Sequence, residues 1–275
     1  MGEVRQSDTG RADSTLPIGR ITLRALALPF SKLPTLAKFG IIPLGLALAA
    51  HLVGWLLGKT GDGWTLRSGW IVIAHTVIFT PFAVAWTKLA VDGNQSVASR
   101  GAFVYGPVEW RYLIANSMIL ICTFAAVGLP YQLLLSAYLD DDRILVTEAS
   151  LLTLVAGILI AIGYIRIAFL FPAIATERYQ GLGRCWRQTS GQLERLGAII
   201  AVSYVPFFIA GEALKRLRPQ YDTWLATTGL AAFDAMLHLF MLAAVSGAPA
   251  LAYKFLVIGR HRAGNERSAH NFAAD

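Results

Sequence analysis

The chain has 275 residues, of which 55% are hydrophobic and only 15% are charged. Water-soluble domains carry about 25% charged residues, and disordered chains are poor in apolar residues, so the composition excludes both classes. The two cysteines are too few for a disulfide-stabilised scaffold. The composition therefore predicts an integral membrane protein.

Six apolar stretches are long enough to be membrane-spanning helices. A helix that crosses a hydrocarbon layer of ~30 Å needs about 20 mostly apolar residues, because its backbone groups must be paired within the segment. The stretches that meet this requirement are residues 39–57, 70–87, 113–135, 150–175, 196–214 and 235–258. We predict an all-α polytopic membrane protein whose six transmembrane helices form three hairpins.

The start of the sixth span is open, because the apolar run from Leu225 to Ile258 is too long for one straight crossing. Either Gly247 and Pro249 break this run, or its first turns lie along the membrane interface. The span can therefore begin near Leu225 or near Ala235.

The chain divides into one transmembrane domain and two polar ends. We predict that residues 1–17 and the basic tail 260–275 are disordered, and that residues 18–259 form the six-helix domain. Near its start, apolar residues recur at helical spacing beside Arg20 and Arg24. This pattern predicts an amphipathic helix on the membrane surface, interrupted at Pro29, with a linker as the alternative.

Two loops, residues 88–111 and 176–195, also carry amphipathic patterns. Short helices lying at the membrane interface would place the apolar side chains in lipid and the charged ones in water. We therefore expect short cytoplasmic interfacial helices in both loops.

Lys and Arg residues give the orientation, because basic flanking segments are retained in the cytoplasm. Most of them fall on the side of the predicted membrane that holds the N-terminus, and residues 215–218 are the local exception. Both termini are therefore predicted to be cytoplasmic. The net charge of +7 then indicates contact with anionic lipid headgroups, and we expect no nucleic-acid partner because no recognition fold accompanies the charge.

Four residues form a candidate intramembrane polar site: Arg166, His75, Asp234 and His238. Asp234 and His238 are four residues apart and share one helical face. An unpaired charge deep in the membrane costs at least ~2.5 kcal/mol, so such a pair can relay protons or hold a ligand. If the sixth span begins near Ala235, both groups instead lie at the outer interface.

Arg166 lies near the end of the fourth span. Its side chain can extend toward the headgroups of the inner leaflet. Alternatively, it pairs with Glu177 or with a lipid phosphate.

The loop after the fourth span holds a second group of candidates that would face lipid or a partner: Arg178, Arg184, Trp186, Arg187 and Arg195. The same region contains Pro172-Ala-Ile-Ala175-Thr-Glu177, followed by Leu182-Gly-Arg-Cys-Trp186-Arg-Gln-Thr189-Ser-Gly191-Gln-Leu193. This pattern resembles that of six-helix bacterial inner-membrane proteins of unknown function, the YciC-like proteins and the membrane domain attached to some glycerophosphodiester phosphodiesterases. The resemblance implies an inner-membrane location and a surface helix between two spans. It does not imply hydrolysis, since no segment outside the membrane can hold a barrel of ~250 residues.

The sequence contains no HExxH, GxSxG or CxxC motif, so we predict no catalytic residue, metal site or cofactor. The expected function is that of a non-enzymatic scaffold or accessory subunit that engages lipid or a membrane protein partner. The alternative is a permease for a small or lipid-like solute. Convergence of the four intramembrane polar residues on one cavity would favour the permease.

Overall fold

The computed structural model describes residues 16–58, 64–98, 100–101, 103–139, 143–179, 181–217 and 224–259. Within these ranges every regular element is helical. The elements are α1 Ile18–Ser31, α2 Leu33–Gly58, α3 Trp64–Asp92, α4 Gln95–Ala98, α5 Pro107–Thr123, η1 Phe124–Gly128, α6 Leu129–Leu139, α7 Arg143–Ile167, α8 Leu170–Ala175, α9 Leu182–Gln188, α10 Leu193–Leu217, α11 Trp224–Tyr253 and η3 Lys254–Ile258.

Six helical segments of the described chain are long and apolar enough to cross a membrane. They are Leu33–Ala50, Ile73–Asp92, Pro107–Leu134, Val146–Ala175, Leu193–Leu214 and Ala232–Ile258. The third segment runs from α5 into α6 through the π-helical turn η1 without leaving the helix. The predicted all-helical class and the six potential spans are therefore confirmed.

The sixth long helix, α11, runs from Trp224 to Tyr253, and the segment Ala232–Ile258 is apolar and long enough to span a membrane. Neither Gly247 nor Pro249 breaks it, because α11 continues to Tyr253. The apolar run is thus one continuous helix that passes directly into η3.

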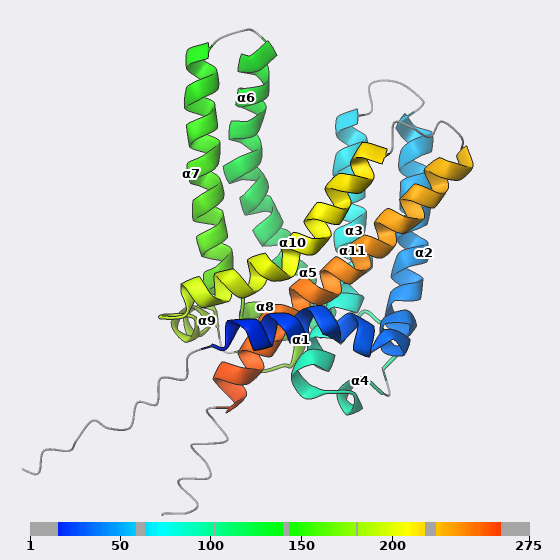
Figure 1. Ribbon diagram of the computed structural model, residues 1–275, viewed down its shortest axis with the longest axis vertical. Coiled ribbons are helices and arrows are strands. Elements are labelled where there is room, and N and C mark those ends of the chain that lie inside the picture. The colour runs from blue at the N-terminus through cyan, green and yellow to red at the C-terminus, as the bar shows by residue number, and fades with distance from the viewer. Residues whose placement is uncertain are drawn as a thin grey trace, which may run out of the picture.

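Consecutive long helices pack side by side as α2 with α3, α6 with α7, and α10 with α11. Helix α1 crosses α10 and α11, and the short helices α1, α4, α8 and α9 gather at one end of the molecule (Figure 1). The α6–α7 pair stands apart from α2, α3, α10 and α11 over most of its length (Figure 1). It joins the rest of the molecule near α8 and α9, where α7 contacts α9 and α10.

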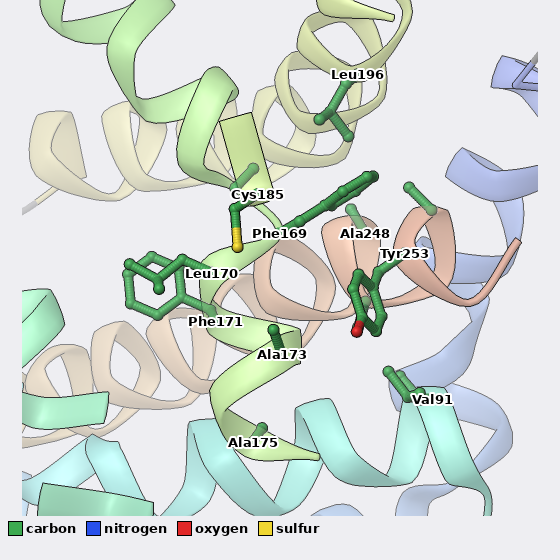
Figure 2. Close-up of a cluster of buried hydrophobic side chains, with 14 of the residues drawn as sticks. Val91, Phe169, Leu170, Phe171, Ala173, Ala175, Cys185, Leu196, Ala248 and Tyr253 are labelled. Carbon is green, nitrogen blue, oxygen red and sulfur yellow. The ribbon is translucent and has the colours of Figure 1, made fainter. Parts of the chain in front are cut away.

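The main core surrounds α8. Figure 2 shows side chains of this segment, including Phe169 and Ala173, packed among Leu196 of α10, Tyr253 of α11 and Val91 of α3. Small residues supply the α11 side of this core, since Ala248, Ala250 and Ala252 are fully buried. Such residues let helix backbones approach closely, which is how helices associate where lipid removes the hydrophobic driving force.

The outer surfaces of α5, α7 and α10 are strongly apolar. Ile121 on α5, Leu159 on α7 and Ile209 on α10 are each more than half exposed. Apolar patches of this extent are unusual on soluble monomers. These surfaces therefore fit a hydrocarbon environment.

The sequence prediction that the first amphipathic segment is interrupted at Pro29 is wrong. Pro29 lies inside α1, and the chain turns at Lys32 before α2. The turn is compatible with Pro34, because a proline in the first turn of a helix removes an N–H that would have no partner there.

The predicted disordered ends fall mainly outside the described residues, but Leu16 is buried in the main core.

Candidate functional site

A cavity of about 300 Å³ lies between α3, α5, α7, α8 and α11. Its lining residues are His75, Thr76, Phe79, Thr80, Ala83, Tyr112, Asn116, Tyr164, Phe171, His238, Leu242, Val245, Ser246 and Pro249. All of its walls belong to segments that are apolar and long enough to span a membrane. The cavity thus lies between potential membrane-spanning helices, and its largely apolar wall carries several polar side chains.

Two histidines lie at one part of this cavity. The ring of His75 on α3 is 5.2 Å from the ring of His238 on α11, measured between centroids. Phe79 contacts both rings, at 5.5 Å from His75 and 5.2 Å from His238. The rings of Phe79 and His75 are nearly perpendicular, at an interplanar angle of 83°, which is a favourable arrangement for an aromatic pair.

The remaining polar lining consists of hydroxyl and amide groups. Tyr112 and Asn116 come from one face of α5, Tyr164 comes from α7, and Ser246 comes from α11. The Ser246 hydroxyl donates a hydrogen bond to the Leu242 carbonyl at 2.6 Å. Tyr112 packs on Phe171 with a centroid distance of 4.8 Å.

None of the described lining residues carries a permanent charge. The donors and acceptors are imidazole, phenol, amide and hydroxyl groups, which hydrogen-bond neutral polar atoms and can exchange protons. A volume of about 300 Å³ is at the lower end of the ~300–1,000 Å³ range of small-molecule sites. The cavity therefore suits a small solute with hydrogen-bonding groups.

The four predicted intramembrane residues do not meet at one place. His75 and His238 share the cavity, but Asp234 and Arg166 are not among its lining residues. Asp234 is exposed one helical turn before His238. The guanidinium of Arg166 lies 5.4 Å from the centre of the Trp186 ring, in a cation–π contact. Asp234 and His238 are one helical turn apart on α11, but only His238 lines the cavity, whereas the Asp234 side chain is exposed.

The alternative considered for Arg166, an ion pair with Glu177, does not form among the described residues, because Glu177 pairs with Lys88 at 3.6 Å. Next to it in sequence, Arg178 pairs with Asp92 at 3.1 Å. Both ion pairs connect the end of α3 to the segment after α8.

The other predicted loop residues divide into inward and outward groups. Arg195 donates a hydrogen bond to the Leu16 carbonyl at 3.3 Å. Arg184 and Arg187 are exposed, and Trp186 is half exposed. Buried Thr189 fastens α9 to α7, because its hydroxyl lies 2.8 Å from the Arg166 carbonyl and donates to it.

A buried ion pair that sequence reasoning missed lies at the start of α5. The Glu109 carboxylate is almost fully buried, pairs with Arg100, and accepts a hydrogen bond from the Gly106 backbone N–H at 2.8 Å. Burial lowers the pKa of Arg100, and the coulombic effect of Glu177 partly opposes this shift. The signal was available, since Glu109 follows Pro107 in the first turn of a helix, where a carboxylate is favoured.

Sequence reasoning also missed Asn116, Tyr112, Tyr164 and Ser246 as cavity residues. Asn116 was the most detectable, because an amide inside an apolar span is unusual and needs partners. Tyrosine and serine give no such signal, since both occur throughout membrane helices as interfacial or helix-bonded residues.

No family model, curated protein or solved structure matches the chain. Among the described residues, no group of three or more His, Cys, Asp or Glu side chains is placed to hold a metal ion.

Proposed function

We propose that the chain is a non-enzymatic, multi-pass membrane protein that acts as a permease for a small polar or amphiphilic solute. The observation that carries the proposal is the pairing of His75 and His238 on the wall of a cavity between membrane-spanning helices. Polar groups are expensive in hydrocarbon and usually mark a pathway or a binding site. Only two of the four intramembrane polar residues line the cavity, so the full convergence expected of a permease is absent, and this proposal rests on the histidine pair and the cavity alone.

Helix packing supports an arrangement of three hairpins, since α2 pairs with α3, α6 with α7, and α10 with α11. The proposed orientation places α1, α4, α8 and α9 at the cytoplasmic face of the inner membrane. The distribution of Lys and Arg in the sequence supports it, because these residues are retained in the cytoplasm. Both termini are then cytoplasmic, and the short helices lie at the interface.

A second candidate function is the scaffold or accessory subunit. It is favoured by the exposed side chains of Arg184 and Arg187 and by half-exposed Trp186. Together they offer two cations and an aromatic ring to anionic headgroups or to a membrane protein partner. This function does not use the cavity, so the two candidates can be separated by filling it.

The test is solute entry into proteoliposomes, followed by stopped-flow light scattering with glycerol, urea, acetate and glycine as probes. We expect at least one probe to enter wild-type vesicles faster than protein-free vesicles. Ser246→Phe, which adds bulk inside the cavity, should lower that rate by roughly tenfold or more. Ser150→Phe is the matched control, because Ser150 is exposed on α7 and its hydroxyl bonds only the Val146 carbonyl of its own helix, at 2.7 Å.

Should Ser246→Phe fail to accumulate, Asn116→Leu provides a second variant. Leucine has nearly the volume of asparagine but lacks the amide, so this variant removes a polar group from the cavity wall and should also lower the rate of solute entry. The permease proposal is wrong if every probe enters wild-type and protein-free vesicles at the same rate. It is also wrong if both cavity variants transport as the wild type does.

A further inference from the structure

A second, larger depression lies on the outside of the helix bundle, between α5 and α7. Its volume is about 530 Å³, and its far end is bounded by α8 and α9. The α5 side consists of a single helical stripe that includes Arg111, Ala115, Met118 and Cys122. These positions are spaced by three or four residues, so they line one straight wall. We call this depression the α5–α7 groove.

The groove is apolar along its length and cationic and aromatic at one end. Met118 and Leu159 form its walls and are each more than 60% exposed. Gly163 on α7 leaves the groove open, because a side chain added there would meet no atom within 4 Å. At the end near α9, the groove is lined by Arg111, Tyr179 and Trp186.

This end has the chemistry of a headgroup site. Arg111 is exposed, and no ion pair between it and a carboxylate is present in the described part of the chain. Arginine binds phosphate oxygens with charge-assisted, often bidentate hydrogen bonds. Tyr179 and Trp186 are amphipathic rings of the kind that sit at headgroup depth, and the guanidinium of Arg166 stacks on the Trp186 ring.

The groove also has the length of one leaflet. From Arg111 to Cys122, α5 rises about 16 Å at 1.5 Å per residue. Half of a ~30 Å hydrocarbon layer is about 15 Å. A lipid with its phosphate at Arg111 would therefore end its acyl chain near Cys122.

We propose that the α5–α7 groove is a binding site for one anionic glycerophospholipid, with its phosphate on Arg111 and an acyl chain along Met118 and Gly163. Charge complementarity selects this occupant, because the open end of an otherwise apolar groove presents a cation and two interfacial aromatic rings. The proposal does not rest on the permease. Neither Arg111 nor Gly163 lines the histidine cavity, although Tyr164 lines both sites.

The experiment is native mass spectrometry of the delipidated full chain in detergent, titrated with three probes. Palmitoyl-oleoyl phosphatidylglycerol is anionic, phosphatidylcholine with the same chains is zwitterionic, and glycerol phosphate has no chains. We expect one molecule of phosphatidylglycerol to bind at least roughly tenfold more tightly than phosphatidylcholine, because both carry the phosphate but the choline cation of phosphatidylcholine offsets its attraction to Arg111. Glycerol phosphate should not bind measurably, because most of the contact surface belongs to the acyl chain.

Two variants separate the headgroup from the chain. Arg111→Gln should weaken the binding of phosphatidylglycerol more than that of phosphatidylcholine, and so remove most of the preference for phosphatidylglycerol. Gly163→Leu should weaken both lipids, because the new side chain fills the groove. The matched controls are Arg24→Gln, an exposed arginine on α1, and Gly45→Leu, a position on α2 where an added side chain also meets nothing within 4 Å.

Equal binding of the two lipids by the wild type would overturn the proposal. It would be overturned as well if Arg111→Gln and Gly163→Leu bound both lipids as their controls do. Tight binding of glycerol phosphate would assign the site to a soluble phosphate rather than to a membrane lipid, which also contradicts the proposal.

Discussion

Glu109 is the most deeply buried carboxylate in the described chain, with 2% of its surface exposed. Its negative charge balances the positive charge of the Arg100 guanidinium. It also accepts a hydrogen bond from the backbone N–H of Gly106, the residue before α5. Removing one member of a buried ion pair is costly because it leaves the other charge desolvated. Glu109 therefore holds the entry of the third span to the loop before it.

Glu109→Gln keeps the shape of the side chain but removes its charge, so we expect a loss of roughly 3 kcal/mol in the free energy of unfolding. Thermal unfolding in detergent, followed by circular dichroism, measures this as a lower Tm. Glu194→Gln is the control, since Glu194 is exposed in the first turn of α10, where a carboxylate contributes at most about 1 kcal/mol. Equal Tm values for the two variants would show that the buried pair does not stabilise the fold.

Cys185 illustrates how burial sets the chemistry of a single side chain. Only 2% of its surface is exposed, and burial raises the pKa of its thiol. At a given pH the folded protein therefore holds less thiolate than the unfolded chain, in which the pKa returns to about 8.5. Because the thiolate is the nucleophile, folding should suppress the reactivity of this cysteine.

The prediction is that, in a Cys122→Ser background, N-ethylmaleimide at pH 7.5 modifies Cys185 slowly in the folded protein and at the rate of a free thiol after unfolding. The difference should narrow as the pH rises, because more thiolate then forms in the folded state. Intact-protein mass spectrometry over time measures both rates. Rapid modification of the folded protein would contradict the burial of α9 against the core.

At the scale of elements, α2 and α11 approach each other closely at one glycine. A side chain atom added at Gly40 would lie only 2.6 Å from the Leu239 side chain, which is itself buried. Five residues later on the same helix, an added atom at Gly45 would meet nothing within 4 Å. Gly40 is therefore a site of close helix approach, whereas Gly45 faces outward.

Gly40→Val should lower the stability by about 1–3 kcal/mol, because overpacking forces the two helices apart. Gly45→Val should have little effect, since it introduces the same side chain into open space. Tm values of the two variants, measured in one detergent, give the comparison. If the Gly40→Val and Gly45→Val proteins had the same Tm, the close approach of α2 and α11 at Gly40 would be contradicted.

At the scale of the whole molecule, α1, α4, α8 and α9 gather at one end, and the start of α1 and the end of η3 lie there as well (Figure 1). This arrangement makes the orientation testable with a single reporter at either end of the chain. Because basic flanks are retained in the cytoplasm, both ends should lie on the cytoplasmic side.

We expect green fluorescent protein fused after Asp275 to fluoresce, and alkaline phosphatase fused at the same place to be inactive, in bacterial cells. Reporters fused after Gly58, between α2 and α3, should give the opposite result. An active phosphatase after Asp275 would invert the proposed orientation. It would also place Arg184 and Arg187 on the outer face.

The sequence alone was sufficient for the class of protein and the positions of the six long helices. The reason is physical: the thickness of the hydrocarbon layer sets a minimum length, and an apolar stretch either reaches that length or does not. The turn at Lys32 was less predictable. Pro29 and Pro34 are both compatible with a helix end, and only the structure shows that α1 continues through the buried Pro29 to Ser31.

Which polar residues meet was decided by the tertiary structure. His75 and His238 were both identified from the sequence, but nothing in it paired them with each other rather than with Asp234 or Arg166. Helices that are apolar on every side carry no periodic signal for the inward face, so their rotation is set by side-chain packing between elements. That packing turns His75, His238 and Asn116 toward one cavity and directs Arg166 onto Trp186.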